Sequence, residues 1–526
     1  MITVIYTRSL RIGAFPHIMV SYFELPANLT AAKFIAKLSD KVAINLASKQ
    51  YLLKTYYDSF DWRLYRHGLT CEFNRSRQTS TFILTDRKNG ELVASAIIFD
   101  VPSFTKQFNP GKIRQTLEPL LEMRALLALC TLECEAYQIN IVNEDEKIVL
   151  RLLVEEFELL NNRLTVFPVK GYDKYTDQIT ELVSKEMEAM PVDKPILLDA
   201  LRLQGRHPKD YSSKLDIPLT PDMRADVASK FIFSNLLRTI KINEQGTIAD
   251  TDSEFLHDFR VAVRRTRVGL SQFKDVLPEE TIARYKGFFS WLGKSTGETR
   301  DLDVYLLNFE QYKKKLPAVI RQSINPLHNF LELKKHKSQR QLAKKLRSGK
   351  YLTMLAEWEQ YLQAAPPEHP AEANANLTVK ELADQKIWKA YKRVIKQGDT
   401  IAPDSPPEAF HILRKSSKKL RYLMEFYQHL YPDRQIAKLI KPLKRLQDVL
   451  GDYQDYSVQQ EQLKQFSEEM QGINTPSRTF LAMGVLIQDF ESRKCKVRDH
   501  FAMQFAAFKK PEVHTFFSAL FAPNKS

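Results

Sequence analysis

The 526-residue sequence is poor in cysteine and has no long apolar run. Its four cysteines, Cys71, Cys130, Cys134 and Cys495, are too few to hold a chain of this length together by disulfides. Cys130 and Cys134 have the spacing of neighbours on one helix face, but no nearby Cys or His completes a zinc-binding set, so we predict no metal site and no cofactor. Without a run of about 18 apolar residues or a signal-peptide pattern, we expect a cytoplasmic protein with no membrane segment.

Charge is unevenly distributed along the chain. Lys and Arg exceed Asp and Glu by 15 overall, but residues 1–200 contain 24 basic and 25 acidic side chains, whereas residues 201–526 contain 54 and 38. With 44% hydrophobic residues the chain can bury large cores, which excludes a disordered or collagen-like protein. The composition therefore predicts a near-neutral N-terminal part and a basic C-terminal part whose partner is a polyanion.

Residues 80–170 have the pattern of an antiparallel sheet. Short runs rich in β-branched and aromatic residues, such as STFILT and LVASAIIFDV, alternate with the turn-like segments 86–90 and 143–147. A helical pattern over 174–190 follows, and the proline-containing stretch 191–221 has no sustained periodicity. We therefore expect an α+β domain over 1–200, with helices interspersed among the strands, followed by a linker.

From about residue 220 the hydrophobic period changes to that of an α-helix. Long segments place apolar residues at i, i+3, i+4 and i+7. The Pro-rich segment 364–376 interrupts them near the middle. This pattern predicts an all-α domain over 215–520 that is divided into halves at about 220–360 and 377–520.

The basic part contains an internal repeat. The segment HDFRVAVRRTR begins at His257 and the related segment HILRKSSKKLR begins at His411, an offset of 154 residues. The same offset relates Arg260 to Arg414, Arg264 to Lys418, Arg265 to Lys419, Arg267 to Arg421, Gly297 to Gly451 and Asp301 to Asp455. Matches of residue type at one offset over about 45 residues predict two similar helical units.

Each copy places basic residues on one face of a helix. Positions 257, 260, 264 and 267 follow a +3, +4, +3 spacing, and so do positions 411, 414, 418 and 421. We call these the first and second basic stripes. The opposite faces are apolar and are expected to pack in a core: Leu256, Phe259, Val263 and Leu270 in the first copy, and Ile412, Leu413, Leu420 and Leu423 in the second.

Like charges four residues apart destabilise a helix, so each basic stripe needs an anionic partner. One interpretation is that nearby acids pair with the stripes as salt bridges: Asp301, Asp303, Asp448, Asp452 and Asp455. The other is that both stripes line one groove and bind repeated phosphates, since Arg offers bidentate donors, Lys a point charge and His a switchable charge. We expect a mixture, in which four supporting acids orient some arginines and the surplus cations face the ligand. The supporting acids are Asp301, Asp303, Asp448 and Asp455. A core or capping role for His257 and His411 stays open.

Four segments carry a resemblance to a known family: LHDFRVAVRRTRVGL, TGETRDLDVYL, FHILRKSSKKLRYLMEFY and LQDVLGDYQD. In order and spacing they resemble the signature segments of the CHAD family, the conserved-histidine α-helical domain, over roughly residues 215–520. The resemblance implies two four-helix bundles related by pseudo-two-fold symmetry around a basic channel that binds inorganic polyphosphate without catalysis. The implied ligand-binding residues, with Arg267 added as the repeat partner of Arg421, are His257, Arg260, Arg264, Arg265, Arg267, His411, Arg414, Lys418, Lys419 and Arg421.

The N-terminal part resembles a second family. The segments YYDSFDWRLYRHGLT (56–70) and LTVFPVKGY (164–172) are similar to segments of the CYTH family, a triphosphate tunnel barrel that often precedes CHAD domains. This resemblance implies an antiparallel barrel-like fold over residues 1–200.

The catalytic signature of that second family, an ExExK strand, is absent. In the best register, IMVSYFELP, Ile18 and Val20 stand at the glutamate positions and Tyr22 at the lysine position. Alkyl side chains do not bind Mg²⁺, so we expect a domain that has lost its metal site. Three later glutamates either form an acidic patch or occupy the solvent face of a strand: Glu155, Glu156 and Glu158.

These patterns lead to one main hypothesis and two alternatives. The main hypothesis is a non-catalytic protein that holds inorganic polyphosphate between two helical units, in the cytoplasm or at polyphosphate granules. The first alternative is an inorganic triphosphatase that acts through the N-terminal domain, and the second is a nucleic-acid-binding or ribosome-associated protein. We expect no aromatic side chains among the basic stripes, where stacking on bases would require them, and this disfavours the second alternative. The sequence does not indicate an oligomeric state.

Overall fold

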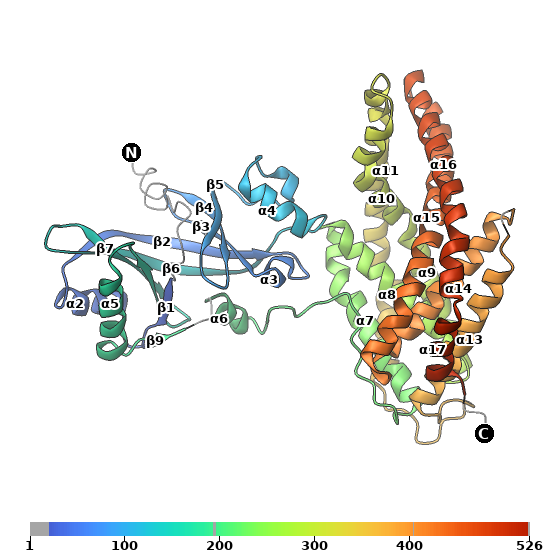
Figure 1. The fold of residues 1–526 in the computed structure, drawn as a ribbon, viewed down its shortest axis with the longest axis horizontal. Helices are drawn as coiled ribbons and strands as arrows, with labels where there is room; N and C mark the ends of the chain where they lie inside the picture. Colours follow the sequence, from blue (N-terminus) through green and yellow to red (C-terminus); the bar gives the residue numbers. More distant parts are fainter. Residues whose placement is uncertain (1–19, 193–195, 403, 524–526) are drawn as a thin grey trace. The chain divides into compact units, whose positions relative to one another are not determined.

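The computed structural model describes residues 20–192, 196–402 and 404–523 (Figure 1). The chain divides into two compact units, with the boundary between Ser212 and Ser213. We call the parts before and after this boundary the N-terminal unit and the helical unit.

Within residues 20–192, the N-terminal unit forms a curled sheet of nine antiparallel strands (Figure 1). Their order across the sheet is β5-β4-β3-β2-β6-β7-β8-β1-β9. The strands are β1 (Ser21–Glu24), β2 (Ile44–Asp58), β3 (Leu69–Arg75), β4 (Ser80–Asp86), β5 (Leu92–Ile97), β6 (Leu127–Val142), β7 (Ile148–Phe157), β8 (Arg163–Pro168) and β9 (Met190–Pro191). The predicted turns at 86–90 and 143–147 join β4 to β5 and β6 to β7, so both hairpin predictions are confirmed.

Helices cover parts of this sheet. Phe34 of α2 (Ala31–Ser39) and Ile179 of α5 (Asp173–Glu186) are buried in one core with side chains of β6, β7 and β8. A second core contains Leu64 of α3 (Arg63–Arg66) and Leu117 of α4 (Lys112–Leu121), and the 3-10 turn η1 (Thr105–Gln107) precedes α4. The helix expected over 174–190 is confirmed as α5, but it ends at Glu186, and Met190 belongs to β9.

Two details of the N-terminal unit differ from the sequence prediction. The segment predicted as a linker contains a two-turn helix, α6 (Ile196–Leu203), because Ile196, Leu197 and Leu201 are buried against β2 and β6. A helix this short offers too few turns for its periodicity to be seen in the sequence. Cys130 and Cys134 lie buried on strand β6 rather than on a helix, and residues four apart on a strand also share one face.

The helical unit is all-α, as predicted. Its helices are α7 (Ala225–Ala249), α8 (Ser253–Gln272), α9 (Glu279–Ser295), α10 (Gly297–Lys315), α11 (Asn325–Leu346), α12 (Gly349–Gln363), α13 (Val379–Asp399), α14 (Pro407–Phe426), α15 (Asp433–Gln471), α16 (Ser477–Phe508) and α17 (Pro511–Phe521), with the 3-10 turns η2 (Arg321–Ile324) and η3 (Gln428–Leu430). Among the residues described, neither unit has a helix that is long and apolar enough to cross a membrane.

The internal repeat is visible in the helix boundaries. The offset of 154 residues carries Ser253–Gln272 of α8 onto Pro407–Phe426, the full length of α14. It also carries the first residues of α7 and α9 onto the first residues of α13 and α15. The copies differ at one point, because the first breaks between α9 and α10 at Thr296, whereas α15 is continuous through the equivalent position. The two halves are therefore related in local structure as well as in sequence.

Both apolar cores found among the described residues of the helical unit draw side chains from both halves. The larger combines α7, α8 and α9 with α13, α14 and the first part of α15, and it includes Phe233, Phe259 and Tyr391. The smaller contains side chains of the α10–α11 hairpin and of the α15–α16 hairpin, among them Tyr305 and Phe490. Each fully buried side chain of this size contributes about 1.5–3 kcal/mol. The halves therefore hold α8 and α14 in a fixed relation.

Candidate functional site

The first basic stripe lies on α8. The side chain of Asp252 caps this helix by accepting hydrogen bonds from the backbone N–H groups of Glu254 (2.9 Å) and Phe255 (3.2 Å). The opposite face packs in the core as predicted, with the following residues at most 3% exposed: Leu256, Phe259, Val263 and Leu270. Burial of this face fixes the rotation of α8 and directs the first basic stripe away from the core.

The second basic stripe lies on α14, which begins with Pro407, a residue favoured in the first turn of a helix. Leu413, Leu420 and Leu423 are fully buried. The packing predicted for Ile412 is wrong, since its side chain is 49% exposed. Ile412 precedes Leu413 by one residue, or about 100° around the helix, which places it outside the buried face.

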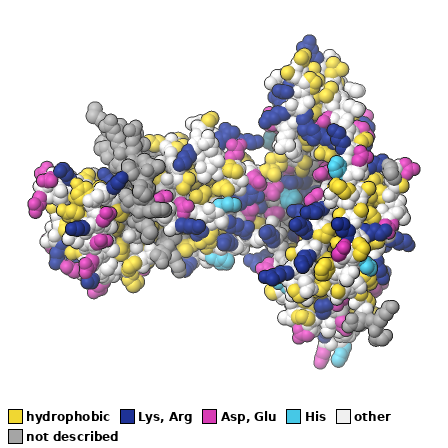
Figure 2. All heavy atoms as spheres, in the orientation of Figure 1, with side chains coloured by type: hydrophobic (Ala, Val, Ile, Leu, Met, Phe, Trp, Pro, Cys, Tyr) yellow, Lys and Arg dark blue, Asp and Glu magenta, His cyan; other side chains and the backbone are white. Residues whose placement is uncertain are grey.

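Helices α8 and α14 pack against each other and bring the two stripes together. Nη2 of Arg265 on α8 donates to Oε2 of Glu425 on α14 at 2.7 Å, and both side chains are largely buried. The guanidinium groups of Arg264 and Arg265 lie 5.8 and 5.6 Å from the ring centre of Tyr422, also on α14. The side chains that sequence reasoning placed on two separate helices therefore share one surface, on a unit whose visible face carries many Lys and Arg side chains (Figure 2).

Arg264 and Lys418 are the residues through which the stripes meet. Burial, together with the nearby positive charges of Arg264 and Arg414, lowers the pKa of the Lys418 ammonium to about 7. Arg264 and Lys418 are equivalent positions of the repeat. Within the described part of the chain, neither side chain has a hydrogen bond or salt bridge.

The remaining residues of the second stripe have partners on α15 or on α14 itself. Nη2 of Arg414 lies 3.4 Å from Oδ1 of Asp455 on α15. The Nδ1 atom of His411 is hydrogen-bonded to Oε1 of Gln454 at 2.6 Å. Nε of Arg421 donates to Oε1 of Glu425 at 2.7 Å. These contacts orient the second stripe without neutralising Lys418.

In the first stripe, Arg260 is tied to the end of α9. Its Nη1 donates to the carbonyl of Gly293 (3.2 Å) and to Oγ1 of Thr296 (2.8 Å). Burial lowers the pKa of Arg260, while the charge of Asp301 opposes that shift. Arg267 is exposed, and its Nη1 lies 3.2 Å from the position a Cβ would take at Gly293. His257 is half-buried on the same face of α8.

The four supporting acids have different surroundings. Asp301 lies near Arg260 and accepts a hydrogen bond from Gln462, and burial raises its pKa. Asp455 pairs with Arg414. Asp303 does not support a stripe, because it is buried beside Lys335 of α11, which binds both Asp303 and Asp250 and joins α10 to α11. Asp448 is exposed on α15 and forms no salt bridge with either stripe among the described residues.

Sequence reasoning missed Tyr422 and Glu425. Tyr422 contradicts the expectation that no aromatic side chain lies among the stripes, although its ring is 6% exposed and offers no open face for a base. Glu425 accepts from both Arg265 and Arg421 and thus links α8 to α14. Its position four residues after Arg421 is a recognisable helical ion-pair spacing, but its contact with Arg265 depends on how the helices cross.

The interior of the N-terminal sheet contains a buried ionic cluster. Lys54 of β2 is 6% exposed and forms a salt bridge with Glu155 of β7, and its Nζ lies 3.7 Å from Oε2 of Glu72 on β3. Burial alone lowers the pKa of a lysine, but Glu155 and Glu72 hold the pKa of Lys54 well above its ordinary value. Two carboxylates thus surround one ammonium group.

The same cluster bears on the missing ExExK strand. Burial and the charge of Glu72 raise the pKa of the Tyr22 hydroxyl, so a neutral phenol stands at the lysine position. Of the two glutamate positions, Val20 is half-buried and Ile18 lies outside the described residues. The described residues contain no group of three His, Cys, Asp or Glu side chains that could share a metal ion.

Neither sequence interpretation of the three late glutamates is correct for all of them. Glu155 is buried with Lys54. Glu156 accepts a hydrogen bond from the backbone N–H of Ala31 at the start of α2 (3.3 Å). Only Glu158 is exposed. Lys54, on another strand of the curled sheet, supplies the opposite charge that allows Glu155 to be buried.

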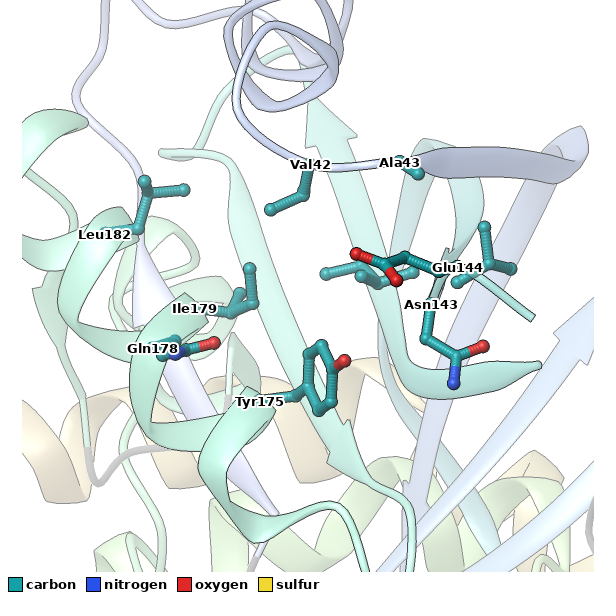
Figure 3. Close-up of a pocket in the computed structure, with 10 residues that line it drawn as sticks. Val42, Ala43, Asn143, Glu144, Tyr175, Gln178, Ile179 and Leu182 are labelled. Carbon is teal, nitrogen blue, oxygen red and sulfur yellow. The ribbon is translucent and has the colours of Figure 1, made fainter. Parts of the chain in front are cut away.

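A separate pocket of about 330 Å³ lies between α5 and the β6–β7 hairpin of the N-terminal unit (Figure 3). Val42, Ile179 and Leu182 give it a mainly apolar lining, to which Glu144 adds one carboxylate. Its lining contains neither Lys nor Arg. This pocket is therefore unsuited to a polyanion.

The helical unit matches a known family. The CHAD domain model matches residues 232–464, which include both basic stripes. An uncharacterized protein of Mycobacterium tuberculosis is 24% identical over 309 residues, which is 56% of this chain and 56% of that protein. The chain thus spans about half the length of the curated relatives it matches.

Solved structures resemble each unit. The crystal structure of the CHAD domain from the plant Ricinus communis is 23% identical and covers 56% of this chain and 96% of its own, with a TM-score of 0.48. PptA from Streptomyces chartreusis is 15% identical, and the match covers 54% of this chain and 99% of PptA, with a TM-score of 0.42. A Hippeastrum protein with a dominant triphosphatase activity is 10% identical, and the match covers 37% of this chain and 99% of that protein, with a TM-score of 0.28. None of these three superpositions reaches a TM-score of 0.5.

Proposed function

Since residues 232–464 match the CHAD domain, we propose that this chain is a non-catalytic protein that binds inorganic polyphosphate through the two basic stripes. The observation that carries the proposal is the approach of Arg264 and Lys418 from two helices, with no salt bridge to either side chain among the described residues. Two neighbouring cations repel each other, and an anion placed between them removes that repulsion. A polymer of phosphates supplies such an anion repeatedly along both stripes.

The side chains of the stripes suit a phosphate polymer. Arg264 and Arg414 present planar guanidinium groups that bind phosphate oxygens in a bidentate way, and Lys418 adds a point charge. Each stripe extends over ten residues, or roughly 15 Å at the rise of an α-helix, so it is long enough to contact several consecutive phosphates. Arg260, Arg265 and Arg421 already donate to protein groups and position the stripes. Such a protein is expected wherever polyphosphate accumulates, including polyphosphate granules.

Hydrolysis of triphosphate by the N-terminal unit is not favoured by its interior. Around Lys54 the carboxylates of Glu155 and Glu72 leave the buried cluster with an excess of negative charge, which repels a triphosphate. The phenol of Tyr22 adds no positive charge. Release of phosphate from tripolyphosphate in the presence of Mg²⁺ or Mn²⁺, and its loss after Glu155→Gln, would restore the triphosphatase alternative.

The dependence of affinity on salt tests the proposed function directly. Each phosphate that is neutralised releases counterions, so the logarithm of the binding constant should fall against the logarithm of salt concentration with a slope of about −0.7 per phosphate. With Arg264, Arg414 and Lys418 each neutralising one phosphate, we expect a slope of about −2. Isothermal titration at several salt concentrations measures it.

A charge-matched single-stranded DNA is the control for this titration. Polyphosphate has one bridging oxygen between phosphorus atoms, whereas DNA separates its phosphates by a sugar, so fewer DNA phosphates fit along one stripe. We therefore expect polyphosphate to bind at least tenfold more tightly than the DNA at equal salt. Equal affinities would contradict the proposal and favour a nucleic-acid-binding protein.

Binding should also depend on pH through Lys418. The pKa of this ammonium is lowered to about 7 in the free protein by burial and by the positive charges of Arg264, Arg414 and Arg421. The carboxylate of Asp455 opposes this shift. Bound phosphates raise the pKa, so the complex takes up a proton, and affinity should fall as pH rises above 7, by up to tenfold per pH unit. Titrations between neutral and mildly alkaline pH check this effect. Lys418→Arg, which stays charged throughout, should bind with little dependence on pH, and an unchanged pH profile in that variant would exclude Lys418 as the cause.

A further inference from the structure

A second group of cations lies on the side of α14 that faces α13. Lys386, Lys389 and Arg393 follow a +3, +4 spacing on α13 and so share one stripe of that helix. Helices α13 and α14 pack against each other, and Lys419 of α14 lies close enough for the charges of those three residues to act on it. We call these four residues, Lys386, Lys389, Arg393 and Lys419, the α13–α14 basic face.

The cations of this face are crowded, and their charges are not balanced by salt bridges within the described parts of the chain. Burial lowers the pKa of Lys419, and the charges of Arg393, Lys386 and Lys389 lower it further. Burial also lowers the pKa of Lys386, with Asp275 as the one carboxylate that opposes the shift. Among the described residues, none of the four has a hydrogen bond or a salt bridge. The neighbouring Lys380 and Lys392 differ, since Lys380 pairs with Asp384 and Lys392 lies over the ring of Trp388.

The internal repeat shows that the fold does not require this face. The offset of 154 residues relates Lys386, Lys389 and Arg393 to Ile232, Asn235 and Thr239 of α7, which carry no charge. It relates Lys419 to Arg265, which is neutralised by Glu425. The first half of the helical unit therefore has the same helices and lacks the basic face. Because the first half folds without such a repulsive cluster, we explain the cluster in the second half by an anionic ligand that neutralises it.

The face is continuous with the proposed polyphosphate site along α14. Lys418 and Lys419 are successive residues, so their side chains leave α14 about 100° apart, one toward α8 and the other toward α13. A chain held at Lys418 needs to pass around part of one helix, whose diameter with side chains is about 10–12 Å, to reach Lys419. A short chain that occupies only the stripes does not cover this distance, whereas a long chain does.

We propose that the α13–α14 basic face is a second polyphosphate-binding segment that makes the affinity of this protein depend on chain length. The inference rests on the proposed function, because it assumes that polyphosphate is the ligand of the stripes. Once the stripes hold one part of a long chain, the next part is present at high local concentration near the face, so even weak contacts there strengthen binding. Only a chain long enough to contact both segments gains this additional affinity, so the affinity depends on chain length.

The test compares short-chain with long-chain polyphosphate on the full-length protein. In the triple variant Lys386→Gln/Lys389→Gln/Arg393→Gln, we expect the affinity for long-chain polyphosphate to fall about tenfold and the salt slope to become shallower by about 2. Affinity for a short chain, sized to the stripes, should stay unchanged. Glutamine keeps high helix propensity, so α13 should remain folded, which circular dichroism and the thermal unfolding midpoint verify.

A matched control is available on α11. Lys337, Arg340 and Lys344 are exposed, share the same +3, +4 spacing and have no ion pair among the described residues. Lys337→Gln/Arg340→Gln/Lys344→Gln removes the same charge elsewhere on the unit and should leave the long-chain affinity near that of the original protein. An equal loss in both triple variants would show a general charge effect and overturn the inference.

Other outcomes separate this inference from the proposed function. If the original protein binds neither short nor long polyphosphate, the proposed function itself is wrong. If it binds both and the α13 variant keeps its full preference for long chains, the α13–α14 basic face does not bind polyphosphate. The stripes are then the whole binding site. Equal losses for short and long chains in the α13 variant would make the face part of one undivided site and would also overturn the inference.

Discussion

Replacing Arg264 and Lys418 together by alanine should lower the affinity for polyphosphate of any length by roughly 100-fold, at about 1.5 kcal/mol for each hydrogen bond to a charged group. The expectation follows from their position, since these two residues approach each other from α8 and α14 and neither forms a salt bridge in the described structure. Both side chains are therefore available to phosphate oxygens without first breaking a salt bridge. Titration of the full-length protein at fixed salt measures the loss.

Folding is not expected to suffer in this double variant. Removing two like charges that approach each other relieves repulsion, so the thermal unfolding midpoint should stay the same or rise. The control Arg340→Ala/Lys344→Ala removes the same two residue types from exposed positions of α11 and should reduce affinity only slightly. Unchanged polyphosphate affinity in Arg264→Ala/Lys418→Ala would remove both stripes from the binding site.

The second large effect is expected in the N-terminal unit, where Lys54→Met should destabilise the fold by about 3–5 kcal/mol. The substitution leaves the carboxylate of Glu155, which is 5% exposed, without its cation, and Glu72 stays beside it. A methionine fills the space of the lysine stem, so the expected loss reflects the uncompensated charge rather than a cavity. Hydrogen–deuterium exchange of β2 and β7 in the full-length chain measures it within this unit.

Lys49→Met is the matched control for this experiment. Lys49 lies on the same strand and pairs with Glu135 at 3.0 Å, but both side chains are about half exposed, so its loss should change the stability much less than the loss of Lys54. The double variant Lys54→Met/Glu155→Met should recover part of the stability, because the buried carboxylate is then removed as well. Equal effects of Lys54→Met and Lys49→Met would mean that the Lys54 cluster is open to water.

The faces of single helices were predictable because they depend on local periodicity. The spacing of Phe259, Val263 and Leu270 identified the buried side of α8, and the repeat placed α14 in the same role. The prediction failed at Ile412, where a position next to the apolar stripe was counted as part of it. It also failed for α6, whose two turns are too short to show a period.

Charged partners were predicted less well than faces. Asp455 lies beside Arg414 as expected, but Asp303 is engaged by Lys335 of α11, a residue that no spacing connects to it. Glu155 was predicted to lie in an acidic patch or on the solvent face of a strand. It is instead buried in an ion pair with Lys54, about a hundred residues earlier in the chain. Side chains that are far apart in sequence meet only when strands and helices are assembled.

By itself, the sequence determined that this protein has a near-neutral β-rich part, a basic helical part and a duplicated helix with cations along one face, since composition and periodicity act through neighbouring residues. Only the tertiary structure decided which cations meet. The crossing of α8 and α14 brings Arg264 to Lys418 and Arg265 to Glu425, and the packing of α13 on α14 adds Lys419 to a separate basic face. Charges interact through space, and their distances are set by shared apolar cores rather than by their order along the chain.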